Sequence, residues 1–216
     1  MSTVQPKLFL VTPPVGDADA FRPALQAACA SDDVAAVLIR LLPGDERTLL
    51  ARLKILVPVA QAHGAAAIVA DPGGPVDVAA LTVRSGADGA HARGPDGLRD
   101  LRDRLRDGQS VGVGGLGTKH DAMGAGEAGA DYVMFGEQRP DGTYPSLDLV
   151  EERATWWAEI FQTPCVAVAP AMATMPVLAG TGAEFVAVGD PVWSWPGGPA
   201  AGVAAARDAM HRGGAA

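Results

Sequence analysis

The chain has 216 residues, 48% of them hydrophobic, with two cysteines and a formal net charge of −8 at pH 7. This length fits one large domain over residues 1–216, and the acidic charge argues against nucleic acid as the main partner. No apolar run approaches the ~18 residues of a membrane-spanning helix, and the N-terminal segment lacks the basic and apolar regions of a signal peptide. We therefore predict a cytoplasmic protein that binds a small molecule and no membrane, with Cys29 and Cys165 buried and reduced.

Eight short apolar segments alternate with helical patterns along the chain. Strands are expected, in order, over residues 7–12, 35–41, 65–70, 90–93, 110–114, 132–135, 165–169 and 185–188. Helices are expected from residue 17 or 19 to about 30, and over about 46–63, 76–84, 95–106, 118–128, 147–161, 173–181 and 198–212. Pro58 is expected to kink or split the second helix, because proline removes a helical hydrogen bond and crowds the preceding turn.

This alternation is typical of a parallel sheet. An open, doubly wound sheet can be written in the same way, but eight strand–helix units match the closed (β/α)8 barrel, so we predict an α/β fold with a single TIM barrel. A Gly-Ala-acid sequence recurs between a helix and a strand at residues 86–88, 129–131 and 182–184. Because glycine adopts the left-handed turn without strain, these segments are expected to be scaffold at the face opposite the active site.

In such barrels the functional site lies at the carboxyl ends of the strands. The residues expected there are Thr12, Arg40, Asp71, Arg93, Gly94, Pro95, Asp96, Gly114, Gly115, Glu137, Gln138, Arg139, Ala169, Pro170, Gly189 and Asp190. Glu137 and Asp190 could accept hydrogen bonds there from a neutral or cationic ligand.

Four segments carry a resemblance to a known family. They are Ala-Asp-Gly-Ala-His at 87–91, His-Asp-Ala-Met at 120–123, Gly-Ala-Asp-Tyr-Val-Met-Phe-Gly at 129–136 and Gly-Ala-Glu-Phe-Val-Ala-Val at 182–188. In sequence and order they resemble the thiamine phosphate synthase and thiazole tautomerase superfamily, over nearly the whole chain. The resemblance implies a TIM barrel and a transferase of thiamine biosynthesis, which moves an aminopyrimidine from its pyrophosphate to a thiazole phosphate.

The resemblance also implies site residues. A departing pyrophosphate carries several negative charges, which a metal ion and fixed cations must neutralise. Arg40 matches the family's arginine for the pyrophosphate, and Asp71 and Asp96 match its two aspartates for Mg²⁺. With Mg²⁺ as cofactor, the predicted substrate-binding residues are Arg40, Gly114, Glu137, Gly189 and Asp190, and no catalytic residue is assigned.

Other positions depart from the family. The replacements are Leu42 for a lysine, Gly114 for a serine or threonine, Tyr144 for the lysine that ends a Pro-Thr-x-Thr-Lys segment, Ala169 and Pro170 for two glycines, and Gly189 and Asp190 for two serines. Because these changes remove cations and an N–H donor, and because Asp190 would repel a phosphate, the sequence predicts an altered phosphate site.

Whether the chain is an enzyme is therefore left open. The leading hypothesis is a divergent thiamine phosphate synthase-like transferase. The alternatives are a non-catalytic or regulatory barrel that binds a small molecule, and an altered tautomerase or hydrolase that uses the carboxylates at the barrel mouth.

Single residues have alternatives as well. Asp71 and Asp96 could cap helices in place of binding Mg²⁺, and Arg40 could serve a structural ion pair. His91 is expected in the core, and His120 as a cap or an exposed residue. Trp193 and Trp195 could cover the mouth or form a subunit contact in a homo-oligomer.

Overall fold

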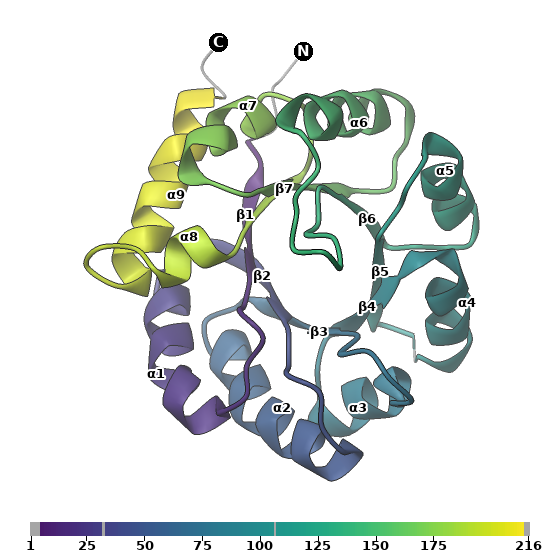
Figure 1. Ribbon diagram of the computed structural model, residues 1–216, viewed down its shortest axis with the longest axis vertical. Helices are drawn as coiled ribbons and strands as arrows, with labels where there is room; N and C mark the ends of the chain where they lie inside the picture. The colour runs from purple at the N-terminus through teal and green to yellow at the C-terminus, as the bar shows by residue number, and fades with distance from the viewer. Residues whose placement is uncertain (1–4, 32, 106, 214–216) are drawn as a thin grey trace.

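The computed structural model describes residues 5–31, 33–105 and 107–213. Its strands are β1 (Lys7–Val11), β2 (Val34–Ile39), β3 (Ala66–Ala70), β4 (Gly89–Arg93), β5 (Ser110–Gly114), β6 (Tyr132–Phe135), β7 (Cys165–Ala169) and β8 (Phe185–Val188). Each strand pairs in parallel with the next, and β8 pairs with β1 (Figure 1). The predicted TIM barrel is therefore confirmed, and the alternative of an open sheet is wrong.

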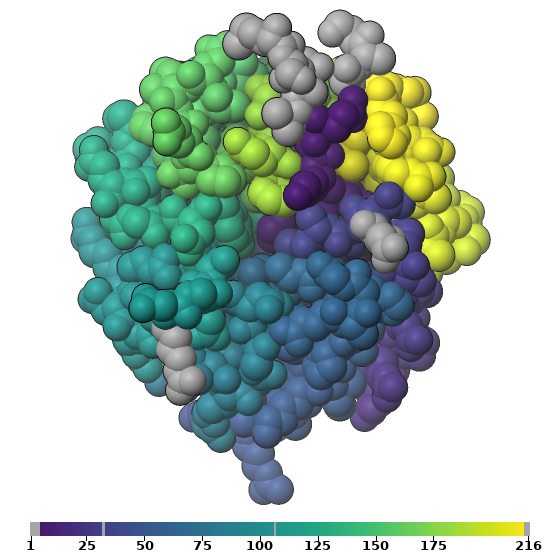
Figure 2. Space-filling view, turned by 180° about the vertical axis from the view of Figure 1, so that it is seen from behind, coloured from purple at the N-terminus to yellow at the C-terminus, as the bar shows by residue number. Residues whose placement is uncertain are grey.

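The helices form an outer ring around these strands (Figure 1). They are α1 (Ala18–Cys29), α2 (Glu46–Gln61), α3 (Val78–Ser85), α4 (Gly94–Arg104), α5 (Lys119–Glu127), α6 (Leu147–Ile160), α7 (Met175–Ala179), α8 (Asp190–Trp193) and α9 (Pro199–Gly213), with a 3-10 turn η1 (Met172–Thr174) before α7. Seen from behind, they follow one another around the barrel in chain order, from purple through teal and green to yellow (Figure 2).

Two details differ from the sequence prediction. Pro58 does not split α2, because it lies in the last turn, where its own carbonyl still accepts the N–H of Ala62 at 2.9 Å. The helix expected after β8 is preceded by the short α8, which the sequence did not predict. Pro191 lies in the first turn of α8, a position that proline tolerates because it lacks only an N–H that would have no helical partner.

Burial follows the two faces of each strand. Strand side chains that point outward pack under the helices. In the same outer cluster, Trp157 of α6 is fully buried and donates its Nε1–H to the carbonyl of Thr163 at 2.7 Å. The smaller inner cluster fills the barrel and includes Phe9, Leu38, Ile68, Tyr132, Met134, Val166 and Val168. Among the described residues, no helix is long and apolar enough to cross a membrane.

Both cysteines are buried and free, as predicted. Burial raises the pKa of the Cys29 thiol to about 11. Burial, together with the charge of Glu184, raises the pKa of the Cys165 thiol to about 12. Both thiols therefore stay protonated near neutral pH, which makes them poor nucleophiles.

The three Gly-Ala-acid segments join the amino-terminal ends of neighbouring strands. The carboxylate of Asp88, before β4, accepts the N–H of Ala67 in β3 at 2.8 Å. Asp131, before β6, accepts from Val111 in β5 at 2.7 Å, and Glu184, before β8, accepts from Cys165 in β7 at 2.8 Å. The glycine of each segment has a positive φ, between 76° and 85°. This arrangement confirms that the repeated sequence is scaffold at the amino-terminal face of the barrel, opposite the carboxyl ends of the strands.

Removing one of these carboxylates should destabilise the fold. Asp131 also accepts a hydrogen bond from Arg102 at 2.8 Å, so Asp131→Ala loses a charged acceptor for two donors. We expect the free energy of unfolding to fall by about 1–3 kcal/mol, measured by urea denaturation followed by circular dichroism. The exposed Asp103 on α4 is the control, and Asp103→Ala should change it by less than about 0.5 kcal/mol. Equal effects of the two substitutions would contradict this role for Asp131.

Candidate functional site at the barrel mouth

Two glycines on the inner face of β5 make room for the side chains of the adjoining strands. In the strand register, Gly112 lies between His91 of β4 and Tyr132 of β6. A Cβ atom on Gly112 would overlap the ring of Tyr132. Because Gly112 has no side chain, His91 and Tyr132 meet across it, with the Tyr132 hydroxyl 2.9 Å from His91 Nδ1. His91 is 3% exposed, which confirms the predicted core position.

Glu137 completes this row of polar side chains at the end of β6. Its carboxylate occupies the space where a side chain on Gly114 would lie. One oxygen, Oε1, is 3.2 Å from His91 Nε2, and the other, Oε2, accepts the N–H of Gly115 at 2.8 Å. The Glu137 side chain is 29% exposed, so it forms the outer end of a buried chain, Tyr132–His91–Glu137, that opens at the mouth.

The surroundings set the protonation of the two ends of this chain. Burial, with the charges of Glu137 and Asp131, holds the pKa of Tyr132 well above its usual range, so the phenol keeps its proton. Burial alone would raise the pKa of the Glu137 carboxyl, but attraction to His91, the hydrogen bonds from His91 and Gly115, and the charge of Arg93 lower the pKa overall. Glu137 is thus a carboxylate at neutral pH. In the His91 tautomer with its proton on Nε2, Tyr132 donates to Nδ1 and Nε2–H donates to Glu137.

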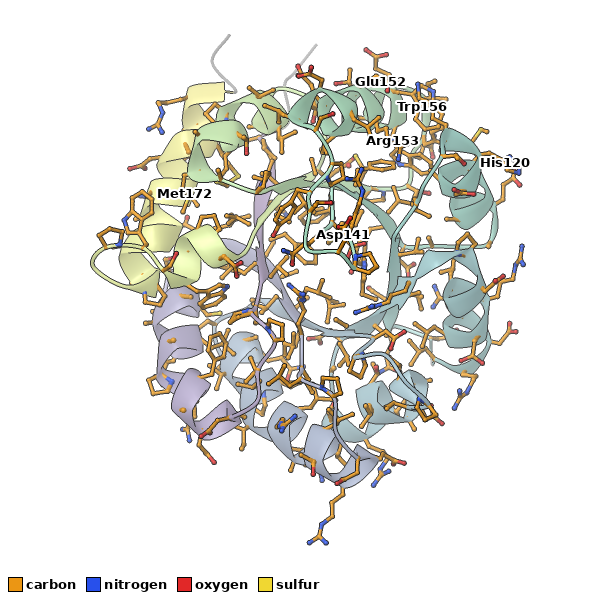
Figure 3. All side chains as sticks on the ribbon, in the orientation of Figure 1. His120, Asp141, Glu152, Arg153, Trp156 and Met172 are labelled. Atoms are coloured by element: carbon orange, nitrogen blue, oxygen red, sulfur yellow. The ribbon has the colours of Figure 1, made fainter. Side chains whose placement is uncertain are left out.

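The loop between β5 and α5, which supplies the Gly115 N–H, is fixed from α6. Arg153 donates hydrogen bonds to the carbonyls of Leu116 at 2.8 Å and Gly117 at 2.6 Å. Next to it, Lys119 lies 2.6 Å from Glu152 and 4.8 Å from the centre of the Trp156 ring. Figure 3 shows Glu152, Arg153 and Trp156 together on α6, beside α5. These contacts hold the backbone donor in place for Glu137.

The loop between β6 and α6 bends over the mouth (Figure 1), and Asp141 near its tip lies above the ring of strands (Figure 3). Further along the same loop, Tyr144 packs against the inner cluster. Burial and the charge of Asp190 raise the pKa of the Tyr144 phenol, while the charge of Arg40 acts in the opposite direction. The charges of Arg40 and Asp190 therefore both lie near enough to Tyr144 to act on it.

The same loop carries a second arginine. Arg139 donates hydrogen bonds to Thr143 Oγ1 at 3.3 Å and to the carbonyl of Tyr144 at 3.4 Å. Asp141 Oδ1 accepts from the N–H and the hydroxyl of Thr143, at 2.9 and 2.7 Å. The loop is thus braced by its own side chains, with a guanidinium and a hydroxyl held near each other.

The two predicted metal ligands lie in different surroundings. Asp71 is half-buried after β3, and its Oδ1 accepts the N–H of Gly73 at 2.7 Å. The side chain of Asp96 is fully exposed and lies 3.8 Å from Arg99. In the part of the chain that the structure describes, no three His, Cys, Asp or Glu residues gather as a metal cluster. The helix-cap alternative is wrong for both residues, because Asp77 caps α3 and the N-cap of α4 is Arg93, without a side-chain hydrogen bond.

Other predicted positions are placed as follows. His120 is exposed on α5 (Figure 3), and the cap of that helix is Thr118, paired with Asp121. Trp193 is partly buried, donates its Nε1–H to the carbonyl of Val11 at 2.7 Å and packs on Phe21. Gly189 approaches the same carbonyl, which would lie 3.2 Å from an added Cβ. A subunit contact through the half-buried Trp195 stays a prediction.

Sequence reasoning placed Glu137 at the mouth and His91 in the core but did not join them. It also missed Tyr132 as a member of the site, and it noted Tyr144 only as the replacement for the family's lysine. One signal was present in β5, where Gly112 and Gly114 alternate with valines. Two glycines on one face of a buried strand indicate that neighbouring groups fill the space above them.

The fold and the mouth together define a class: a closed TIM barrel with arginines and carboxylates at the carboxyl ends of its strands, the end at which such barrels carry their functional sites. The family described as thiamine monophosphate synthase matches residues 8–192, and the chain belongs to this family. It is 42% identical over 201 residues to a thiamine-phosphate synthase of Rhodospirillum centenum, covering 92% of this chain and 94% of the relative. It is 34% identical to a thiamine-phosphate synthase of Hyphomonas neptunium, covering 94% and 95%.

Solved structures support the fold. A thiamine phosphate pyrophosphorylase from Pyrococcus furiosus superposes with a TM-score of 0.71 at 18% identity, covering 97% of both chains. A 3-hexulose-6-phosphate synthase superposes with a TM-score of 0.68, also at 18% identity, covering 93% of this chain and 98% of its own. At such identities the likeness extends to the barrel alone.

The packing of the Tyr132 ring against Gly112 can be tested by adding a side chain at Gly112. Gly112→Ala places a methyl group in the ring of Tyr132, so we expect the free energy of unfolding to fall by about 1–3 kcal/mol. Gly124 on α5 has open space around it, so Gly124→Ala should raise it by up to about 1 kcal/mol through helix propensity. Urea denaturation measures both variants. A Gly112→Ala protein as stable as the wild type would contradict the packing described.

The lowered pKa of Glu137 predicts a pH dependence of stability. Because folding lowers this pKa below its ordinary value of about 4.3, the contribution is complete above that pH and is lost as the pH falls through the folded-state pKa. The difference in unfolding free energy between the wild type and Glu137→Gln should therefore shrink from about pH 5.5 to pH 3. Urea denaturation at several pH values measures it. A difference that stays constant over this range would show that folding does not lower the pKa.

Proposed function

We propose that the protein is an active thiamine-phosphate synthase, which transfers an aminopyrimidine from its pyrophosphate to a thiazole phosphate. The observation that carries the proposal is the position of Arg139. The family's lysine is replaced by Tyr144, yet the Arg139 guanidinium lies against Thr143 Oγ1 and the Tyr144 carbonyl. A cation is therefore present in the loop from which the lysine is absent, and Thr143 keeps the second threonine of the family's segment.

The departing pyrophosphate needs cations on more than one side. Arg40 is half-buried at the end of β2, and its backbone N–H is bound by the buried Thr12 hydroxyl at 2.9 Å. Arg93 at the end of β4 lies near enough to Glu137 to lower its pKa. With Arg139 from the loop, three guanidinium groups from three parts of the barrel can neutralise phosphate oxygens, and guanidinium pairs well with phosphate.

A magnesium ion fits this mouth if the substrate supplies most of its ligands. Mg²⁺ is commonly bound by one or two carboxylates together with substrate phosphates and water. Asp71 is half-buried at a strand end and offers one such carboxylate, whereas Asp96 would have to turn its side chain from solvent to be a second. When bound, the ion would neutralise charge on the leaving pyrophosphate.

One observation favours the alternative of a non-catalytic binding barrel. Tyr144 packs onto the inner cluster with the carboxylate of Asp190 nearby, so an aromatic ring and an acid lie where the family has a lysine and a serine. Such a mouth suits a ligand with an apolar face and hydrogen-bond donors. Identity of 42% over 201 residues to a thiamine-phosphate synthase weighs toward the enzyme.

The assay is formation of thiamine phosphate from the aminopyrimidine pyrophosphate and the thiazole phosphate with Mg²⁺. We expect turnover by the wild type and a fall in kcat/KM of about 10²-fold or more in Arg40→Ala and in Arg139→Ala, because each removes charge stabilisation of the leaving group. Arg99→Ala, on the exposed face of α4, is the matched control and should stay within about twofold of the wild type. Absence of turnover by the wild type would reject the synthase in favour of the binding barrel.

A further inference from the structure

Both oxygens of the Glu137 carboxylate are held by hydrogen bonds at the barrel mouth. Each of its oxygens accepts a hydrogen bond from a different element, Oε1 from His91 on β4 and Oε2 from the Gly115 backbone. Gly136, with a φ of 93° and a Cβ position only 2.9 Å from Val150, turns the chain so that Glu137 enters the barrel. The carboxylate is thereby fixed in position and in charge.

The direction in which this carboxylate faces follows from its partners. His91 is buried beneath it, Gly114 and Gly115 lie beside it, and its 29% exposed surface opens to the mouth. The charged and titratable groups that act on it are His91 and Arg93, and Tyr132 stands behind His91. Below them lies the apolar inner cluster, so a positive charge formed at the mouth would interact with Glu137 more strongly than in water.

The proposed reaction forms such a charge. The bond between the pyrimidine methylene carbon and the pyrophosphate oxygen breaks, and its electron pair leaves with the pyrophosphate. The remaining cation is delocalised into the ring and its amino group, and the thiazole nitrogen lone pair then forms the new carbon–nitrogen bond. No oxidant, reductant or additional proton donor enters this balance.

We propose that Glu137 is a catalytic residue that receives the aminopyrimidine, accepting a hydrogen bond from its amino group and stabilising the cation that forms when pyrophosphate leaves. His91 and Tyr132 are positioning residues that hold the carboxylate from below. This inference rests on the proposed function for its substrate. It also gives a reason for Gly114, since a side chain there would overlap the Glu137 carboxylate.

The test compares Glu137→Gln, which removes the charge and keeps the shape, with Glu151→Gln on the exposed face of α6. Calorimetry measures binding of the free aminopyrimidine alcohol and, separately, of inorganic pyrophosphate with Mg²⁺. We expect Glu137→Gln to raise the Kd of the alcohol at least tenfold and to leave pyrophosphate binding unchanged or tighter, because a negative charge has been removed. General damage to the mouth would weaken both ligands and would overturn the proposal.

Single-turnover formation of thiamine phosphate supplies the second readout. Glu137→Gln should lower the rate about 10²-fold or more, Tyr132→Phe less, and Glu151→Gln not at all. Glu137→Asp keeps the charge and should recover part of the rate, which maintains the test if the glutamine variant folds poorly. An active wild type with an equally active Glu137→Gln overturns the role of Glu137 and leaves the synthase standing. If the wild type forms no product, the synthase fails, and unchanged alcohol binding in Glu137→Gln then overturns the inference as well.

Discussion

The interior of an eight-stranded parallel barrel has to be filled, and β5 fills least of it. Where Gly112 and Gly114 face inward, the barrel wall has no side chains, and close packing requires that neighbours occupy the space. The ring of Tyr132 fills the lower vacancy, and the carboxylate of Glu137 fills the upper one. Polar groups brought into this space must satisfy one another, since a buried polar group without a partner is costly. The Tyr132–His91–Glu137 chain is the result, and packing and site chemistry therefore have a single origin.

At both ends of the barrel, carboxylates accept hydrogen bonds from backbone N–H groups. At the amino-terminal end, Asp131 and its two counterparts accept N–H groups from the first or second residue of the adjacent strand and so join the strand pairs. At the carboxyl end, Glu137 binds the N–H of Gly115 just beyond β5. The two ends differ in whether the carboxylate has a free surface to meet a ligand. The lower acids are occupied by scaffold donors, whereas Glu137 has its exposed surface toward the mouth. One interaction thus stabilises the fold at one end and prepares a charge at the other.

The sequence predicted the barrel well, because eight apolar segments and the repeated Gly-Ala-acid turns are local signals. It also placed Arg40, Asp71 and Glu137 at strand ends. It failed where the answer depends on several elements at once. The contact of His91 with Tyr132 requires the register of β4, β5 and β6, and the position of the Arg139 guanidinium beside Tyr144 depends on how the loop folds back on itself. Replacement of the lysine by Tyr144 is visible in the sequence, whereas the contacts of Arg139 with Thr143 and Tyr144 depend on the conformation of the loop. The helix-cap alternative for Asp71 failed for a similar reason, since Gly73 turns the chain before α3 begins.

The hydrogen bond from Trp193 to the carbonyl of Val11 joins residues 182 positions apart in the chain. With the pairing of β8 to β1, it seals the barrel at the seam between the first strand and the last. During synthesis on a ribosome, the amino-terminal strands emerge long before residue 193 and wait with one edge of the sheet unpaired. Because the cost of closing a loop rises with sequence separation, we expect these closing contacts to form late in folding. In a nascent chain, the edge of β1 therefore has no β8 to pair with until the last part of the sequence is made, and an unpaired strand edge favours aggregation.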